Sequence, residues 1–203
     1  MIRSLILVTG AAEIRPFSAI LAAHNPDLAI HSATTLDELH HALAITGSGA
    51  RLVTVLTGVI VPPDILGALT LSGYNFHPGP PAYPGKYPAA FSLYDGAGQF
   101  GATAHELAVA VDSGPIVGVE YAPVPEGADR EWYVEHAYRL VMRLFLRLAP
   151  QLAMSEAPLS HLPVCWGTRR CSQRAVDNLL AQTHEADWAE QARRTRAFGH
   201  LLR

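Results

Sequence analysis

The chain has 203 residues, of which 49% are hydrophobic and 16% charged, and its formal net charge is −3. A chain of this size and composition can bury a sizeable core, which excludes a disordered protein and requires no metal or disulfide for folding. The slightly acidic balance disfavours a nucleic-acid or membrane-surface binder, because such proteins present a clustered cationic face. The apolar runs are also shorter than the roughly 20 residues that cross a bilayer.

The start of the chain and its two cysteines suggest a location. The first 17 residues hold one short apolar run without a small-residue cleavage site, so we interpret them as leading into a buried strand and not as a signal peptide. Cys165 and Cys171 have neither the spacing of a zinc site nor the number needed for a disulfide framework. We therefore expect a cytoplasmic protein that binds neither membrane nor metal.

The first third of the sequence alternates strand-like and helix-like segments. Apolar runs predict strands at 4–8, 29–31, 52–56 and 71–77. Helices are predicted at 17–23, between Thr35 and Gly47, and from Pro62-Pro63 onward, and Thr35 and Glu38 have the spacing of a capping box. This alternation predicts an α/β fold with a mostly parallel sheet and helices on both faces.

The remainder of the chain begins with a stretch, 77–88, that holds five prolines and two glycines and therefore predicts a stiff loop. A helix is expected at 89–94, strands at 103–109 and 116–124, and an amphipathic helix at 129–148. We expect one catalytic domain over residues 1–150. Residues 151–203 are expected to form a linker and a small C-terminal appendage, which contains Trp166, Trp188 and Phe198.

Asn75 and His77 are the first candidate site residues. Because strand side chains alternate, both point to the same face of a strand, near its carboxyl end, where open α/β sheets bind ligands. An amide can stabilise an oxyanion, and an imidazole can move a proton near neutral pH. The alternative is an Asn that caps the turn and a His packed under the prolines.

Two further residues, Asp112 and His105, each allow a functional and a structural interpretation, and one motif near the start of the chain is rejected. Asp112, in the turn-like Asp112-Ser113-Gly114-Pro115, can orient an imidazole or simply form a turn. His105 is either a site residue or a core His with its hydrogen bonds satisfied. Thr9-Gly10 follows the first strand like a dinucleotide fingerprint, but the further glycines of that motif are missing, so we expect no dinucleotide site.

Taken together, several motifs in this order resemble the 10-formyltetrahydrofolate-dependent formyltransferases. The motifs are GVIVP at 58–62, NFHP at 75–78, YPG at 83–85, GATAH at 101–105 and DSG at 112–114. The resemblance extends over about 52–124, and the segment RRTRAF at 193–198 shows a weaker similarity to the same family. It implies a Rossmann-like formyltransferase fold.

The resemblance implies transfer of a formyl group from 10-formyltetrahydrofolate to the amine of a small molecule. Asn75, His77 and Asp112 would be catalytic: Asn75 and His77 would donate to the oxyanion, and Asp112 would keep His77 protonated. The pterin would bind against a set of small and apolar residues. These residues are Gly58, Val59, Ile60, Val61, Ala108, Val109 and Ala110.

Two alternatives use the same residues. In a formyltetrahydrofolate hydrolase, water replaces the amine. A non-catalytic folate-binding protein would hold the folate without turnover. Neither the resemblance nor the residues name the acceptor, and a homodimer stays open.

Overall fold

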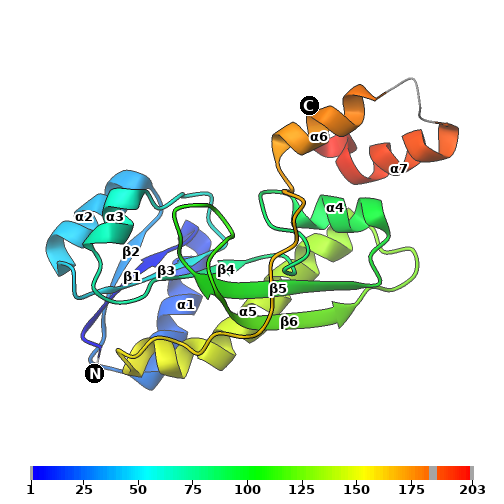
Figure 1. Cartoon of the computed structure of the whole chain (residues 1–203). Coiled ribbons are helices and arrows are strands. Elements are labelled where there is room, and N and C mark those ends of the chain that lie inside the picture. Colours follow the sequence, from blue (N-terminus) through cyan, green and yellow to red (C-terminus); the bar gives the residue numbers. More distant parts are fainter. Residues whose placement is uncertain (1, 183–186, 202–203) are drawn as a thin grey trace.

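The computed structural model describes residues 2–182 and 187–201. Residues 1, 183–186 and 202–203, which fall within the predicted domain ranges, lie outside the described part. The strands form one six-stranded sheet in the order β2-β1-β3-β4-β5-β6 (Figure 1). The strands are β1 (Ser4–Val8), β2 (Ala29–Ala33), β3 (Arg51–Val55), β4 (Tyr74–His77), β5 (Gln99–Glu106) and β6 (Ile116–Pro123).

The sheet is parallel from β2 to β4, whereas β5 is antiparallel to both of its neighbours. The predicted α/β class and the mostly parallel sheet are therefore confirmed. The sequence predicts β5 at 103–109, but the strand begins and ends earlier. Its end is fixed by two backbone hydrogen bonds, from Glu106 N–H to Pro115 and from Leu107 N–H to Gly73, after which the chain turns away from the sheet.

Helices cover the sheet on both faces, as the alternation predicts. The helices are α1 (Ala11–His24), α2 (Leu36–Thr46), α3 (Pro63–Ala68), α4 (Pro88–Asp95), α5 (Arg130–Met154), α6 (Gln173–Ala181) and α7 (Trp188–Phe198), and a short 3₁₀ turn η2 (Gly199–Leu201) follows. α1 and α5 pack on one face around Phe17, Phe76 and Phe145, while α2 and α3 pack on the other. None of the described helices is long and apolar enough to cross a membrane.

Two prolines lie inside helices, where the sequence predicts helix ends. α1 starts at Ala11 and contains Pro16. α5 continues past Pro150 to Met154, so the linker expected from 151 begins only at Ser155. Each proline frees the carbonyl four residues earlier. Those carbonyls belong to Ala12 and Leu146, whose side chains are exposed, so water can solvate them. The free energy gained by burying the apolar face of each helix then exceeds the free-energy cost of its proline.

The C-terminal helices α6 and α7 pack against α4, away from the sheet (Figure 1). Cys171, Val176, Ala197 and Phe198 form a separate small core with Phe91 of α4. Trp188, by contrast, is 82% exposed and contributes nothing to this core. Both cysteines are free thiols, and burial raises the pKa of Cys171 to about 12.

Candidate active site

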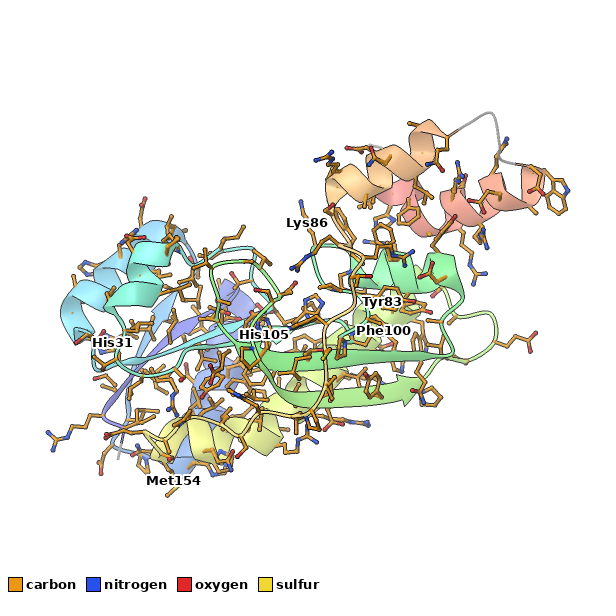
Figure 2. The ribbon with its side chains drawn as sticks, in the orientation of Figure 1. His31, Tyr83, Lys86, Phe100, His105 and Met154 are labelled. Carbon is orange, nitrogen blue, oxygen red and sulfur yellow. The ribbon has the colours of Figure 1, made fainter. Side chains whose placement is uncertain are left out.

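Polar side chains form one row across three neighbouring strands. Thr54 of β3 lies beside Asn75 of β4, and Asn75 lies directly opposite His105 of β5. Residues in register on adjacent strands point to the same face, so the backbone pairing brings these three side chains together. His77 is two residues beyond Asn75 and shares this face. Figure 2 shows His105 at the centre of the molecule, below the loop that carries Tyr83 and Lys86.

Asp112 joins the row from the loop between β5 and β6, where it is 4% exposed. Its Oδ1 lies 3.2 Å from Nε2 of His105 and its Oδ2 lies 3.4 Å from Nδ1 of His77. The Gly85 N–H donates to Oδ2 at 2.8 Å. Burial alone would raise the pKa of this carboxyl, but the His105 hydrogen bond, the charge of His77 and the Gly85 N–H together lower it. Asp112 is therefore ionised at neutral pH.

The backbone is strained at this site. Among the described residues, the non-glycine residues with positive φ are Leu56 (48°) and Asp112 (46°), and both line a cavity above this cluster. Such conformations persist only where the surrounding contacts impose them, and they concentrate at functional sites. Gly85 has a φ of 115°, and a Cβ there would lie within 3.1 Å of the Cys171 backbone, so this donor to Asp112 must be glycine.

Thr54 fixes the orientation of the Asn75 amide. The Thr54 hydroxyl donates to Oδ1 of Asn75 at 2.7 Å, so the amide nitrogen faces His105 at 3.0 Å and Asp112 at 3.5 Å. His105 Nδ1 lies 2.7 Å from the Glu106 carbonyl and donates to it. Its Nε2 can then accept from Asn75 or, when protonated, donate to Asp112. His105 thus belongs to the cluster, a role that the sequence leaves undecided.

His77 is buried, and its two ring nitrogens face acceptors. Nε2 lies 3.0 Å from the Tyr83 carbonyl and therefore carries the proton, while Nδ1 faces Asp112. Burial lowers the pKa of His77; the Asp112 charge and the Tyr83 hydrogen bond oppose this, and His105 adds to it. Desolvation of the ring is thus the larger effect on this pKa, and the charge of Asp112, which is expected to keep His77 protonated, offsets only part of it.

This lowered pKa predicts a pH dependence of stability. A His whose pKa is lower in the folded state takes up its proton first in the unfolded state, so acidification from about pH 6.5 downward destabilises the fold. We expect the free energy of unfolding to fall below about pH 6.5, by up to about 1.4 kcal/mol per pH unit from this group. Denaturant melts of wild type and His77→Gln measure it. An equal acid loss in both proteins would contradict the assignment.

The segment 155–172, which we call the strap, binds both the loop that carries Asp112 and the proline-rich loop, although the sequence predicts no site residues there. Trp166 packs edge-on against His105 and His77, with ring centroids 5.0 and 5.8 Å apart, and its Nε1–H donates to the Gly114 carbonyl at 2.8 Å. Arg170 donates to the carbonyls of Val111 and Asp112. The strap therefore fixes the position of Asp112 from outside the sheet.

The proline-rich loop is bound to the same strap. The Gly167 N–H donates to the Pro81 carbonyl at 2.8 Å, and the Cys171 N–H donates to the Pro84 carbonyl at 2.7 Å. Thr103 holds the other end of the loop, since its hydroxyl donates to the Gly79 carbonyl at 2.8 Å. Sequence spacing offers no signal for these contacts.

The resemblance to the folate-dependent formyltransferases gives these contacts a test: we expect Trp166→Phe to lower kcat about tenfold while changing folate affinity less than about twofold, because one hydrogen bond to the Asp112 loop is lost and the aromatic contact stays. Steady-state kinetics and calorimetry measure the two effects. Trp188→Phe is the matched control, because Trp188 is 82% exposed. A purely structural Trp166 would lower the melting temperature and leave kcat of the folded protein unchanged.

A cavity of about 530 Å³ opens above these residues, at the carboxyl ends of β3 and β4. Its walls include Gly58, Val59, Ile60, Val61 and Ala108, and its floor includes Asn75, His77, His105 and Asp112. Val109 and Ala110 are exposed and do not line it; Leu107 and Val111 do. The structure thus brings all three predicted catalytic residues to one cavity with five of the seven predicted pterin-binding residues.

Comparison with known proteins identifies the family that this arrangement belongs to. A family model described as formyl transferase matches residues 21–142, which include β3, β4, β5 and β6 and most of the cluster described above. The chain belongs to the formyl transferase family. The strap and the appendage lie beyond the matched residues.

Curated relatives match at low identity. The methionyl-tRNA formyltransferase of Chlorobium chlorochromatii is 27% identical over 137 residues, which are 66% of this chain and 40% of that protein. The phosphoribosylglycinamide formyltransferase of Mycobacterium tuberculosis is 29% identical over 151 residues, 72% of this chain and 66% of that protein. The chain thus spans less than two thirds of the length of these relatives.

Solved structures share the fold over nearly the whole chain. A sugar N-formyltransferase from Shewanella has a TM-score of 0.72 at 17% identity, covering 96% of this chain and 87% of that one. A formyltransferase from Anoxybacillus kamchatkensis, solved in complex with UDP-4,6-dideoxy-4-formamido-L-AltNAc and tetrahydrofolate, has a TM-score of 0.71 at 16% identity, covering 90% and 93%. At this identity the similarity establishes the fold, including the predicted Rossmann-like formyltransferase fold.

Proposed function

We propose that the chain transfers a formyl group from 10-formyltetrahydrofolate to the amine of a small molecule. The observation that carries the proposal is the convergence of Asn75, His77 and Asp112 on one cavity that the GVIVP segment also lines. Family membership supports formyl transfer, and the tetrahydrofolate bound in the A. kamchatkensis structure supports a folate donor.

The cavity fits a folate in character. Its walls are apolar at Val59, Ile60, Val61 and Leu107, which suits a flat heterocycle, and the polar side chains of Asn75, His77 and His105 gather around Asp112. When bound there, the folate supplies an activated formyl group. No further cofactor is required by this proposal.

Asn75 is placed to stabilise the charge that develops during the reaction. As the amine attacks the formyl carbon, negative charge grows on the formyl oxygen. One amide hydrogen of Asn75 faces His105 at 3.0 Å, and the other, on a nitrogen 3.5 Å from Asp112, is the uncharged donor for this oxygen. Thr54 holds that amide in the required orientation. A preoriented donor loses no reorganisation energy at the moment of reaction.

His77 and Asp112 are placed to take up a proton. The lone pair of Nδ1 and the Asp112 carboxylate face each other at 3.4 Å, so one proton between them turns a repulsive pair into a hydrogen bond. The proton lost by the attacking amine can occupy this place and then pass to the folate nitrogen that leaves. We therefore assign proton transfer to His77, and not donation to the oxyanion, because its Nε2–H is already bound to Tyr83.

The test combines binding with product analysis. Calorimetry with a substituted tetrahydrofolate should show binding without nucleic acid, and incubation with 10-formyltetrahydrofolate and amines should give a formylated amine. Formyl loss to water alone would indicate a hydrolase. Tight folate binding with no formyl loss under any condition would indicate a binding protein, and no binding at millimolar ligand would refute the donor.

A further inference from the structure

A second cavity, of about 440 Å³, adjoins the first on the α5 side of the sheet. It shares Leu56, Pro78 and Lys86 with the folate cavity. Leu56 and Pro78 directly follow the ends of β3 and β4. The two cavities therefore meet over the strand ends, next to His77, which is where two substrates must meet for one group to pass between them.

Most of the side chains that line the second cavity are apolar. Val134 and Ala137 come from the first turns of α5, and Pro88 and Ala90 from the start of α4. The C-terminal appendage supplies the remaining side, through His200 and Leu201 of η2. The appendage thus completes a cavity beside the reaction centre.

The charged side chains that line this cavity are both cationic. Lys86 and Arg130 line it, and none of the described residues in its lining is acidic. Within the described part of the chain, neither cation forms an ion pair; the Lys86 ammonium lies over the Tyr87 ring at 5.2 Å. The charge of Arg130 also acts on His200: burial, and after it this positive charge, lower the pKa of the His200 imidazole. An unpaired cationic lining attracts an anion.

We propose that this cavity binds the formyl acceptor, and that the acceptor is an amine with an apolar body and a negatively charged group, carboxylate or phosphate, bound by Arg130 and Lys86. This inference rests on the proposed formyl transfer. The apolar part of the acceptor packs against Val134 and Leu201, and its amine reaches past Pro78 to the formyl carbon. The appendage acts as a determinant of acceptor specificity.

The test uses a set of primary amines in which each anionic member has a neutral counterpart, a carboxylate with its amide and a phosphate with its alcohol. Mass spectrometry detects the formylated amine. We expect kcat/KM for the preferred anionic amine to exceed that of its neutral counterpart at least about tenfold, as a charge-assisted hydrogen bond implies. The carboxylate and phosphate members distinguish the two anion classes. Added salt should reduce the preference.

Arg130→Gln tests the assigned residue, because Arg130 lines only the second cavity. The variant should lose roughly tenfold in kcat/KM for the anionic amine, while its neutral counterpart and the affinity for a folate analogue change less than about twofold. Arg143→Gln, an exposed arginine on the same helix outside the cavity, is the matched control and should match wild type.

Two results would overturn the inference and leave formyl transfer standing: neutral amines formylated as well as anionic ones, or an unchanged preference in Arg130→Gln. Failure of every amine to be formylated would overturn the inference together with the proposed function. Folate calorimetry, run on the same samples, shows whether the donor site survives in that case.

Discussion

Replacing Asp112 with Asn, or His77 with Ala, is expected to lower the rate of formyl transfer by about a hundred- to ten-thousand-fold, the usual worth of general acid–base assistance. The amide introduced by Asp112→Asn keeps an oxygen acceptor for the Gly85 N–H, so the loop can retain its place while the carboxylate charge is lost. Single-turnover kinetics with the accepted amine, or with the hydrolytic side reaction, measure the effect.

The double variant separates a coupled pair from two independent residues. We expect it to lose little more rate than the worse single variant, since members of a catalytic unit are strongly non-additive. Folate affinity should change less than about tenfold, because the apolar wall at Val59, Ile60 and Val61 is untouched. Wild-type-like turnover in either single variant would remove the assignment of these residues.

The second large effect concerns Arg51, which is fully buried beneath the end of α5. Its guanidinium donates to five main-chain carbonyls, of Gln151, Leu152, Ser155, Glu156 and Ala157. These carbonyls end the helix and begin the strap. We expect Arg51→Met to lower the free energy of unfolding by about 3 kcal/mol, because several largely buried acceptors lose their donor at once. Figure 2 labels Met154 at this end of the helix.

Denaturant unfolding measures this loss, with Arg143→Met as the control for removing an exposed arginine from the surface. Since the strap leads from this helix end to Trp166, the folded fraction of Arg51→Met should also show a lower kcat. A loss below about 0.5 kcal/mol, the usual range for surface changes, would show that water replaces the guanidinium without penalty.

Local sequence patterns were enough to predict the alternating strands and helices at the start of the fold. Apolar runs such as Ser4–Val8 form strands because they must be buried on both faces, and the Thr35–Glu38 capping pair begins α2 where its spacing predicts. The motifs around Asn75, His77 and Asp112 also identified the family from residues alone. Local patterns sufficed here because each depends on neighbours in the chain.

The remaining site residues come together through contacts between segments that lie far apart in the chain. His105 joins the cluster because the register of β4 against β5 places it opposite Asn75. Trp166 lies in the strap and bonds to Gly114, which is 52 residues earlier in the sequence. Burial lowers the pKa of His77, and the turn after β5 leaves Val109 and Ala110 exposed to solvent. Strand register, desolvation and long-range contacts depend on the whole packed molecule, so they cannot be predicted from the spacing of residues in the sequence.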